Sequence, residues 1–256
     1  MRLLPLFALA PLFALAPPAR AAEKDALVYE MRTYTAAKGK MDALHARFKN
    51  HTLKLFDKHG ITNVAYFTPE ADKESKLIFF LSYPNKDARE KSWKAFLNDA
   101  DWKKAYADSE KDGKLVDKVE TRFLTTTEYS PVFKVGEANT KRVFELRTYV
   151  ATKGNLGHLN DRFKDHTIKL FEKYGMTNVV YWNVLKGTQD DDKLLVYLLA
   201  HKSKDEAAKS FDAFRKDPDW LAARKASEVK GGGSLTEAKG GVVSEFLVPT
   251  AYSPLK

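Results

Sequence analysis

"EMRTYTAAKGKMDALHARFKNHTLKLFDKHGITN" occupies residues 30–63, and the chain repeats this stretch at residues 145–178 as "ELRTYVATKGNLGHLNDRFKDHTIKLFEKYGMTN". Both copies keep Glu, Arg and Tyr at alternate positions, and both keep a His in the segment that follows. A long internal repeat is the signature of one supersecondary unit built twice. The 256 residues therefore predict two units of roughly 110 residues each, which is a common domain size.

The first copy changes its hydrophobic period along the chain. Residues 27–35 alternate as a strand does, whereas apolar residues after Gly39 recur at steps of three and four as far as Gly60. Two β-rich runs, each ending in Pro and joined by a short polar connection, predict a hairpin. The expected elements are a strand at 27–35, a helix between 40 and 60, strands at 61–69 and 76–84, helical pieces within 85–113 that break near 98–101, and a strand at about 115–127.

The second copy repeats this order, and the two copies even end alike, with "EYSP" at 128–131 and "AYSP" at 251–254. Its expected elements are strands at 142–150, 176–184, 193–201 and 242–248, a helix within 153–174 and helices within 203–230. In the helical parts, "DADW" at 99–102 and "DPDW" at 217–220 predict a new helix capped by the first Asp, with the Trp closing one end of the core.

The order βαββαβ predicts an α+β fold with ferredoxin-like repeats, in which helices cover one face of each sheet. The other face needs a partner, so we expect the two repeats to pack sheet to sheet as an intramolecular α/β barrel. Two independent domains are the alternative, and they would expose two large apolar faces. The expected division is a first repeat at 22–131, a linker at 132–140 and a second repeat at 141–256.

Composition excludes several classes of protein. With 44% hydrophobic residues the chain can bury a core, and without Cys it has no disulfides and no thiol chemistry. The net charge is +9, but the basic residues are interspersed with acidic ones rather than gathered in a block. We therefore expect no nucleic acid partner, while attraction to acidic small molecules stays open.

The N-terminal residues predict export. Arg2 precedes a short apolar run, and the small residues around "ARA" at 19–21 suit cleavage after Ala21, so we expect a signal peptide at 1–21. The alternative, a membrane anchor, is disfavoured because the run is short and interrupted by Pro. A periplasmic or secreted bacterial protein, with no stable membrane anchor after cleavage, is the expectation.

The chain resembles the NIPSNAP family, whose domains belong to the dimeric α/β-barrel group. The resemblance is carried by E-x-R-x-Y followed by F-x-x-H and K-x-G in both copies, by "DADW" and "DPDW", and by the closing "YSP". It implies tandem NIPSNAP domains that form a barrel within one chain, and it leaves open a homodimer. The biochemical role of the family is mostly unassigned, while the wider barrel group includes small monooxygenases, haem-degrading enzymes and dehydratases.

Two strands carry the candidate binding residues. Alternation places Glu, Arg and Tyr on one face of each, and we expect that face to point into the space between the two sheets. Arg could anchor an anionic small molecule and Tyr could donate a hydrogen bond to it. The alternative is that Glu and Arg pair with each other and fix how the sheets meet. These candidates are Glu30, Arg32, Tyr34, Glu145, Arg147 and Tyr149.

His51 and His166 occupy equivalent positions, and the helical period places both on the apolar side of the first helix of each repeat. A neutral His there could act as a general base or hold a ligand, or it could be a core residue satisfied by its neighbours. The other four His lack a counterpart and are interpreted as surface variation, with His201 aligned to Pro84; they are His45, His59, His158 and His201.

No pattern predicts a metal site, a cofactor or a hydrolase triad. Our hypothesis is a small-molecule-binding barrel, with an enzyme acting on a hydrophobic or aromatic compound left open and the catalytic residues unknown. The alternative is a non-enzymatic structural or interaction protein, in which the polar residues of the inner face only hold the two repeats together.

Overall fold

The computed structural model describes residues 27–132 and 142–256; the predicted signal peptide and nearly all of the predicted linker lie outside them. The first repeat forms the predicted elements in the predicted order. They are β1 (Val28–Ala36), α1 (Met41–Arg47), η1 (Phe48–Thr52), α2 (Leu53–Lys58), β2 (Thr62–Pro69), β3 (Lys76–Tyr83), α3 (Lys86–Asn98), α4 (Ala100–Ser109) and β4 (Val116–Thr126).

The second repeat has the same elements. They are β5 (Val143–Val150), α5 (Leu156–Arg162), η2 (Phe163–Thr167), α6 (Ile168–Lys173), β6 (Thr177–Val184), β7 (Leu194–His201), α7 (Lys204–Lys216), α8 (Pro218–Lys230) and β8 (Val242–Pro249). The predicted caps are confirmed: the Asp99 carboxylate accepts from the Trp102 amide, and Asp217 accepts from that of Trp220. In each case the capping Asp is the single residue between the new helix, α4 or α8, and the preceding one.

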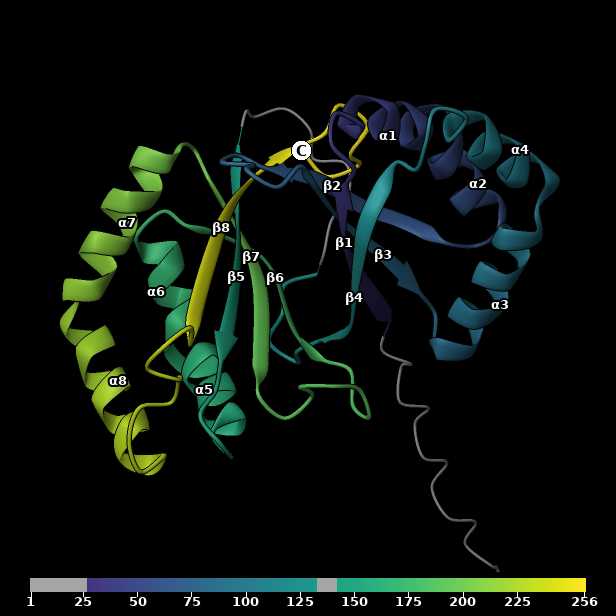
Figure 1. Ribbon diagram of the computed structural model, residues 1–256. Helices are drawn as coiled ribbons and strands as arrows, with labels where there is room; N and C mark the ends of the chain where they lie inside the picture. Colours follow the sequence, from purple (N-terminus) through teal and green to yellow (C-terminus); the bar gives the residue numbers. More distant parts are fainter. Residues whose placement is uncertain (1–26, 133–141) are drawn as a thin grey trace, which may run out of the picture.

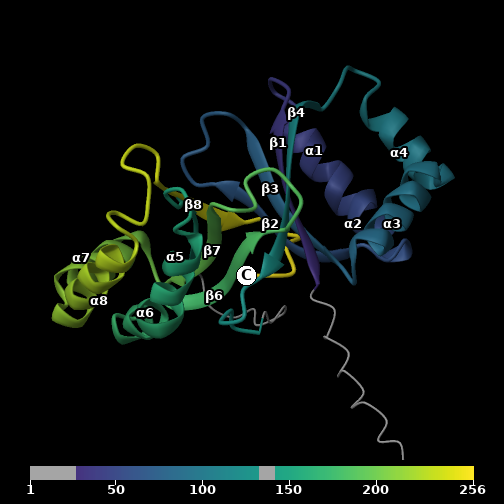
Figure 2. The ribbon, with the colours of Figure 1, turned by 90° about the horizontal axis from the view of Figure 1, so that it is seen from below.

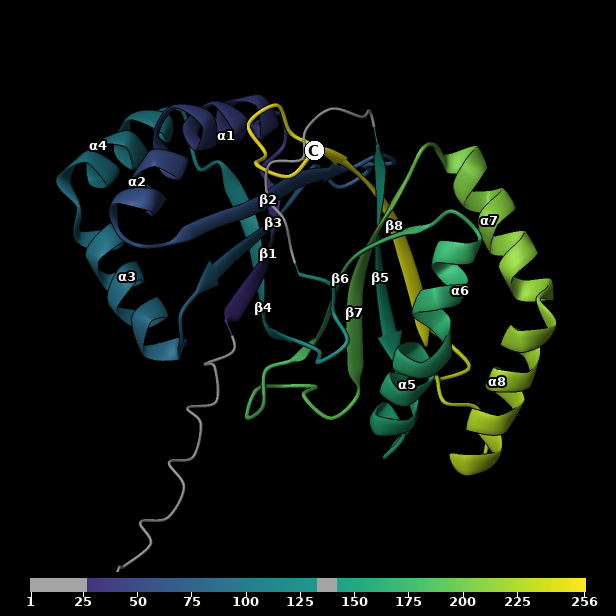
Figure 3. The same ribbon diagram turned by 180° about the vertical axis from the view of Figure 1, so that it is seen from behind.

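The strands close into one antiparallel barrel in the order β1-β3-β2-β8-β5-β7-β6-β4. Each repeat contributes a four-stranded sheet, and the sheets join where β2 pairs with β8 and β4 with β6. Helices α1–α4 lie on one side of the barrel and α5–α8 on the other (Figures 1 and 3), as the view from below also shows (Figure 2). The predicted intramolecular barrel is confirmed.

The barrel interior is a packed apolar core to which both repeats contribute. Trp182 of β6 stacks on Phe80 of β3 with ring centroids 5.0 Å apart, and Tyr29 lies 5.6 Å from the same indole. Met31 packs against this cluster, and Leu146 belongs to it. Burial of this much apolar surface from both sheets is what holds the two repeats together.

The prediction that Glu30, Arg32 and Tyr34 point into the space between the sheets is wrong. Tyr29 and Met31 face the interior, so their neighbours on β1 face the helices instead. The second repeat is reversed in the same way: Leu146 faces inward, and Glu145, Arg147 and Tyr149 face outward. Alternation could not choose the face, because both faces of these strands are covered and each carries large side chains.

The two "YSP" segments each pack on the other repeat. The Ser253 hydroxyl accepts from the Tyr66 amide at 2.9 Å, and the Ser130 hydroxyl accepts from the Tyr181 amide at 3.0 Å. The tyrosines of these segments also hydrogen-bond to the other repeat: the Tyr252 hydroxyl bonds to His45, and the Tyr129 hydroxyl bonds to Asn160. The repeated motif is thus a reciprocal clasp between the repeats.

Candidate functional site

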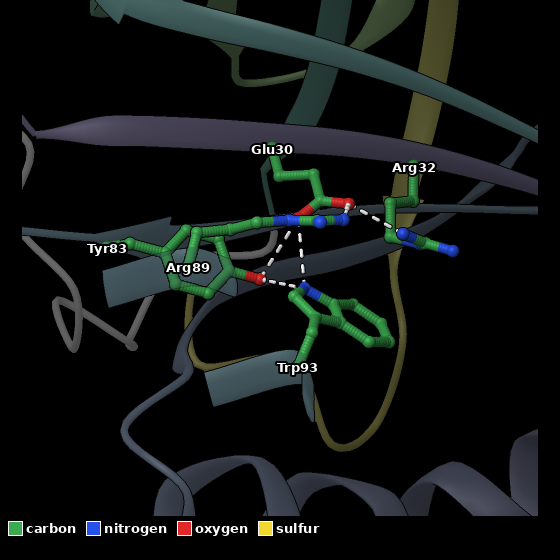
Figure 4. A network of polar contacts seen from close by, with 5 residues as sticks. All are labelled: Glu30, Arg32, Tyr83, Arg89 and Trp93. Carbon is green, nitrogen blue, oxygen red and sulfur yellow. Dashed lines mark hydrogen bonds and ion pairs between the residues drawn. The ribbon is translucent and has the colours of Figure 1, made fainter. Parts of the chain in front are cut away.

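Glu30 is the centre of a polar network between β1 and α3, although its side chain is fully buried (Figure 4). Arg32 Nη1 donates to Glu30 Oε1 at 2.6 Å, and Arg89 donates to both carboxylate oxygens at 2.9 and 3.0 Å. The Tyr83 hydroxyl and the Trp93 indole N–H each donate to Oε2 at 3.1 Å. The Glu–Arg pairing that the sequence left open as the alternative is therefore present, and α3 supplies a second guanidinium.

The network keeps its members in fixed charge states. Burial alone would raise the pKa of Glu30, but hydrogen bonds from Arg89 and the charge of Arg32 outweigh it and lower that pKa. Burial and the neighbouring carboxylate raise the pKa of Tyr83 far above its usual range. At neutral pH, Glu30 is therefore an anion and Tyr83 a neutral donor.

A π-helical turn interrupts the first helix of each repeat, in η1 and in η2. The Thr52 hydroxyl donates to the carbonyl of Arg47, five residues earlier, and Thr167 does the same to Arg162. Because a π turn takes more residues than an α turn, residues after it are rotated relative to a regular helix. Arg47, Phe48 and Thr52 consequently all point inward.

The same rotation corrects the prediction for the repeated His. His51 and His166 are exposed, and neither lies on the apolar side of its helix. Thr52 and Thr167 occupy the inward positions that a uniform α period had assigned to these His residues. These two candidate ligand-binding residues therefore take no part in the Glu30 and Glu145 networks.

A pocket of about 760 Å³ lies in the first repeat between the outer face of the sheet and the helices. Its wall is mainly aromatic, formed by Tyr34, Phe48, Phe56, Trp93, Phe96, Trp102 and Tyr106. Its charged lining residues are Arg32, Arg47, Arg89, Lys103 and Glu110. Two predicted candidates, Arg32 and Tyr34, thus line a cavity, but it lies under the helices rather than in the barrel.

Arg47 is positioned on the helix side of this pocket. Its Nη1 donates to Glu110 Oε1 at 3.0 Å, and its guanidinium carbon lies 5.1 Å from the ring centroid of Tyr106 and 5.6 Å from that of Trp102. Cations at such distances from aromatic faces are attracted by the ring quadrupole. Arg47 is therefore held by one carboxylate and two rings.

In the second repeat Arg147, the equivalent of Arg32, has hydrogen-bond partners within the protein for all of its nitrogens. Arg147 donates through Nε to the Tyr197 hydroxyl at 2.9 Å, through Nη2 to the Tyr149 hydroxyl at 3.3 Å, and through Nη1 to Glu145. Glu145 also accepts from the Ser244 hydroxyl, and His201 Nε2 lies 3.0 Å from its other oxygen. Each nitrogen of Arg147 has a partner within the protein.

His201 is not surface variation. It is buried and pairs across the sheet with Val143, as Tyr83 pairs with Val28, so its counterpart is Tyr83 and not Pro84. Two other His are also half-buried and bonded: His45 to Tyr252 and His59 to Asp99 at 2.6 Å. The interpretation of these three as surface residues is wrong, because strand register and inter-repeat contacts are not visible in sequence spacing.

Sequence reasoning missed Arg47, Tyr83, Arg89 and Trp93. One signal was present for Arg47, since both copies keep Arg-Phe at 47–48 and 162–163. Arg89 and Trp93 had no such signal, because Ala207 and Phe211 replace them in the second repeat. In residues 27–132 and 142–256, no three metal-ligating side chains come together. Within the same ranges, no helix combines the length and apolar character that a membrane span needs.

Comparison with known proteins identifies the family. The NIPSNAP family model matches residues 29–131 and 144–254. The chain belongs to the NIPSNAP family. No curated protein matches the sequence significantly.

Solved structures with TM-scores above 0.5 share the fold of this NIPSNAP protein at low sequence identity. An anthrone oxidase-like protein is 12% identical, with a TM-score of 0.55 over 91% of this chain and 95% of its own. A candidate monooxygenase from Fusobacterium nucleatum is 12% identical, with a TM-score of 0.54 over 88% of this chain and 92% of its own. A NIPSNAP protein from Agrobacterium tumefaciens is 21% identical and covers 41% of this chain, with a TM-score of 0.38.

Proposed function

We propose that this NIPSNAP protein binds a hydrophobic or aromatic small molecule in the pocket of its first repeat. The observation that carries the proposal is the aromatic cavity of about 760 Å³ beneath the helices. Ligand pockets typically measure about 300–1,000 Å³ and combine apolar walls with a few convergent polar groups. The aromatic wall, with Arg32 and Arg47 in it, has this character.

The alternative role of the polar residues finds less support. The partners of Glu30 are Arg32, Tyr83, Arg89 and Trp93, and all of them belong to the first repeat. The partners of Glu145 all belong to the second. Among the described residues, these networks fasten a sheet to its own helices or strands, while the apolar core and the clasps join the repeats. Export remains part of the proposal, which places binding in the periplasm or outside the cell.

A neutral fluorescent probe tests the site. N-phenyl-1-naphthylamine is apolar, has two aromatic units and brightens in apolar surroundings, so we expect it to bind the purified protein at one site per chain. Val119 lines the pocket and is 47% exposed, so Val119→Trp fills the pocket without disturbing a packed residue. We expect this variant to lose at least about tenfold in affinity, or 1.4 kcal/mol.

The second repeat supplies the control. Val242 pairs with Tyr149 as Val119 pairs with Tyr34, and it is 46% exposed. Val242→Trp should therefore leave probe affinity unchanged. No saturable binding, or equal loss in the two variants, would overturn the proposed site.

A further inference from the structure

The first repeat holds more positive charge around its pocket than its own carboxylates neutralise. Glu30 faces two guanidinium groups, those of Arg32 and Arg89, and Arg47 is paired one to one with Glu110. One buried carboxylate thus balances the charge of two cations only in part. In the second repeat Ala207 replaces Arg89, so Glu145 faces the guanidinium of Arg147 alone, with His201 and Ser244 completing its shell.

Arg32 also has donor capacity that the protein does not use. Its Nε is buried and has no hydrogen-bond partner among the described residues. Figure 4 shows the outer end of its guanidinium pointing away from Glu30, and Arg32 lines the pocket. Leaving a buried donor of a charged group unsatisfied costs free energy. An acceptor supplied by a ligand would recover that free energy.

A single ring hydroxyl explains why the two repeats differ here. Phe79 occupies the position of Tyr197: Phe79 stacks on Tyr66 with centroids 5.3 Å apart, and Tyr197 stacks on Tyr181 at 5.0 Å. The Tyr197 hydroxyl accepts from Arg147 Nε, whereas Phe79 offers Arg32 no acceptor. Arg47 and Arg162 both keep an unpartnered Nε, so the difference between the repeats rests on Arg32.

We propose that the ligand of the first repeat is an aromatic carboxylate, whose anionic group accepts a hydrogen bond from the guanidinium of Arg32 while its ring lies against the aromatic wall. The inference rests on the proposed binding function and adds the chemical class. A planar carboxylate suits the planar guanidinium, which binds such groups through parallel N–H donors. The surplus cation favours an anion over a neutral ligand of the same shape.

Competition between two matched compounds tests the inference. 2-Naphthoate and methyl 2-naphthoate share one ring system and differ in charge, and each is used to displace N-phenyl-1-naphthylamine from the full chain at pH 7.5. We expect the acid to displace the probe at least about tenfold more effectively than the ester. Equal displacement by both would overturn the inference while leaving the proposed binding site intact, and absence of probe binding would overturn both.

Two variants assign the preference to Arg32. Arg32→Met should abolish the preference for the acid and leave displacement of the probe by the ester unchanged. If the variant lost displacement by both compounds in parallel, the assignment would be contradicted. Arg32→Met leaves Glu30 with one guanidinium, so a second variant is needed in case it fails to fold. Phe79→Tyr places a hydroxyl beside Arg32 Nε in an otherwise equivalent ring, and it should reduce the preference for the acid about threefold.

The matched control is Tyr197→Phe, which frees Arg147 in the second repeat. It should leave the preference for the acid unchanged, because the pocket lies in the first repeat. A drop in preference in Tyr197→Phe as large as that in Phe79→Tyr would show that the anion is not recognised by Arg32.

Discussion

Glu30 and Glu145 occupy equivalent positions in the sequence, but different side chains balance the charge of each carboxylate. Glu30 is held by Arg32 and Arg89, and Glu145 by Arg147, His201 and Ser244. The sequence allowed the pair formed within each strand as an alternative, because residues two apart on a strand share a face. It could not predict Arg89 or His201, because their contacts depend on how α3 packs on the sheet and on the register of β7 within it.

We expect Glu30→Gln to lower the free energy of unfolding by about 3–5 kcal/mol, because it leaves two guanidinium groups that are only 13% and 23% exposed without an anion. Glu145→Gln should cost less, about 1–3 kcal/mol, since Arg147 keeps the hydroxyls of Tyr149 and Tyr197 as acceptors. Urea unfolding of the two variants measures the difference. A larger loss in Glu145→Gln would contradict this account of the charge balance.

The lowered pKa of Glu30 gives a pH dependence with a definite sign. A carboxyl whose pKa is lower in the folded protein stabilises the fold above its unfolded pKa of about 4.3, and this contribution is lost as the pH falls through the folded pKa. Between pH 6 and pH 3 the stability of Glu30→Gln should therefore fall less than that of the unaltered protein. Exposed Glu90→Gln is the control, and its curve should run parallel to that of the unaltered protein.

At the scale of elements, the π turns explain the error in the prediction for His51 and His166. A helix from 40 to 60 was predicted, and α1, η1 and α2 fill 41–58. The uniform α period nevertheless placed His51 inside, and the π turn replaces it there with Thr52. In the structure Phe48, Thr52, Leu55 and Phe56 form the inward set, without His51.

We expect Thr52→Val to lower the free energy of unfolding by about 0.5–1.5 kcal/mol, because it removes the hydroxyl that satisfies the Arg47 carbonyl. Thr167→Val should cost a similar amount through the Arg162 carbonyl. Only Thr52→Val should also weaken the binding of N-phenyl-1-naphthylamine, since Thr52 lines the pocket with Arg47. Urea unfolding and probe titration of both variants give the comparison. Equal changes in probe affinity would contradict the view that the π turn of the first repeat shapes the site.

At the scale of the whole molecule, the barrel was predictable and the location of the pocket was not. Each repeat has a sheet with one face that its own helices do not cover. The two sheets bury these faces against each other when the strands close into one barrel. Which face of β1 turns inward depends on the packing of Tyr29 and Met31 against the opposite sheet, and alternation alone is symmetric between the two choices.

The joining of the repeats gives the last prediction. Separating the chain into 22–131 and 141–256 would uncover the apolar inner faces, break the pairing of β2 with β8 and of β4 with β6, and leave the clasping Ser130 and Ser253 without their partners. We expect neither half to be a stable monomer on its own, because the faces it would expose form the main core.

Co-expressed halves should instead assemble one to one, since the same surfaces can re-form without the covalent link, and the assembly should bind N-phenyl-1-naphthylamine as the intact chain does. Size-exclusion chromatography with light scattering measures the mass of each half and of the mixture. Replacing both Ser130 and Ser253 with Ala should lower the affinity between the halves, because it leaves two strand amides without acceptors. A first half that is monomeric and melts like the intact protein would mean that the repeats are independent domains and that the barrel core contributes little to stability.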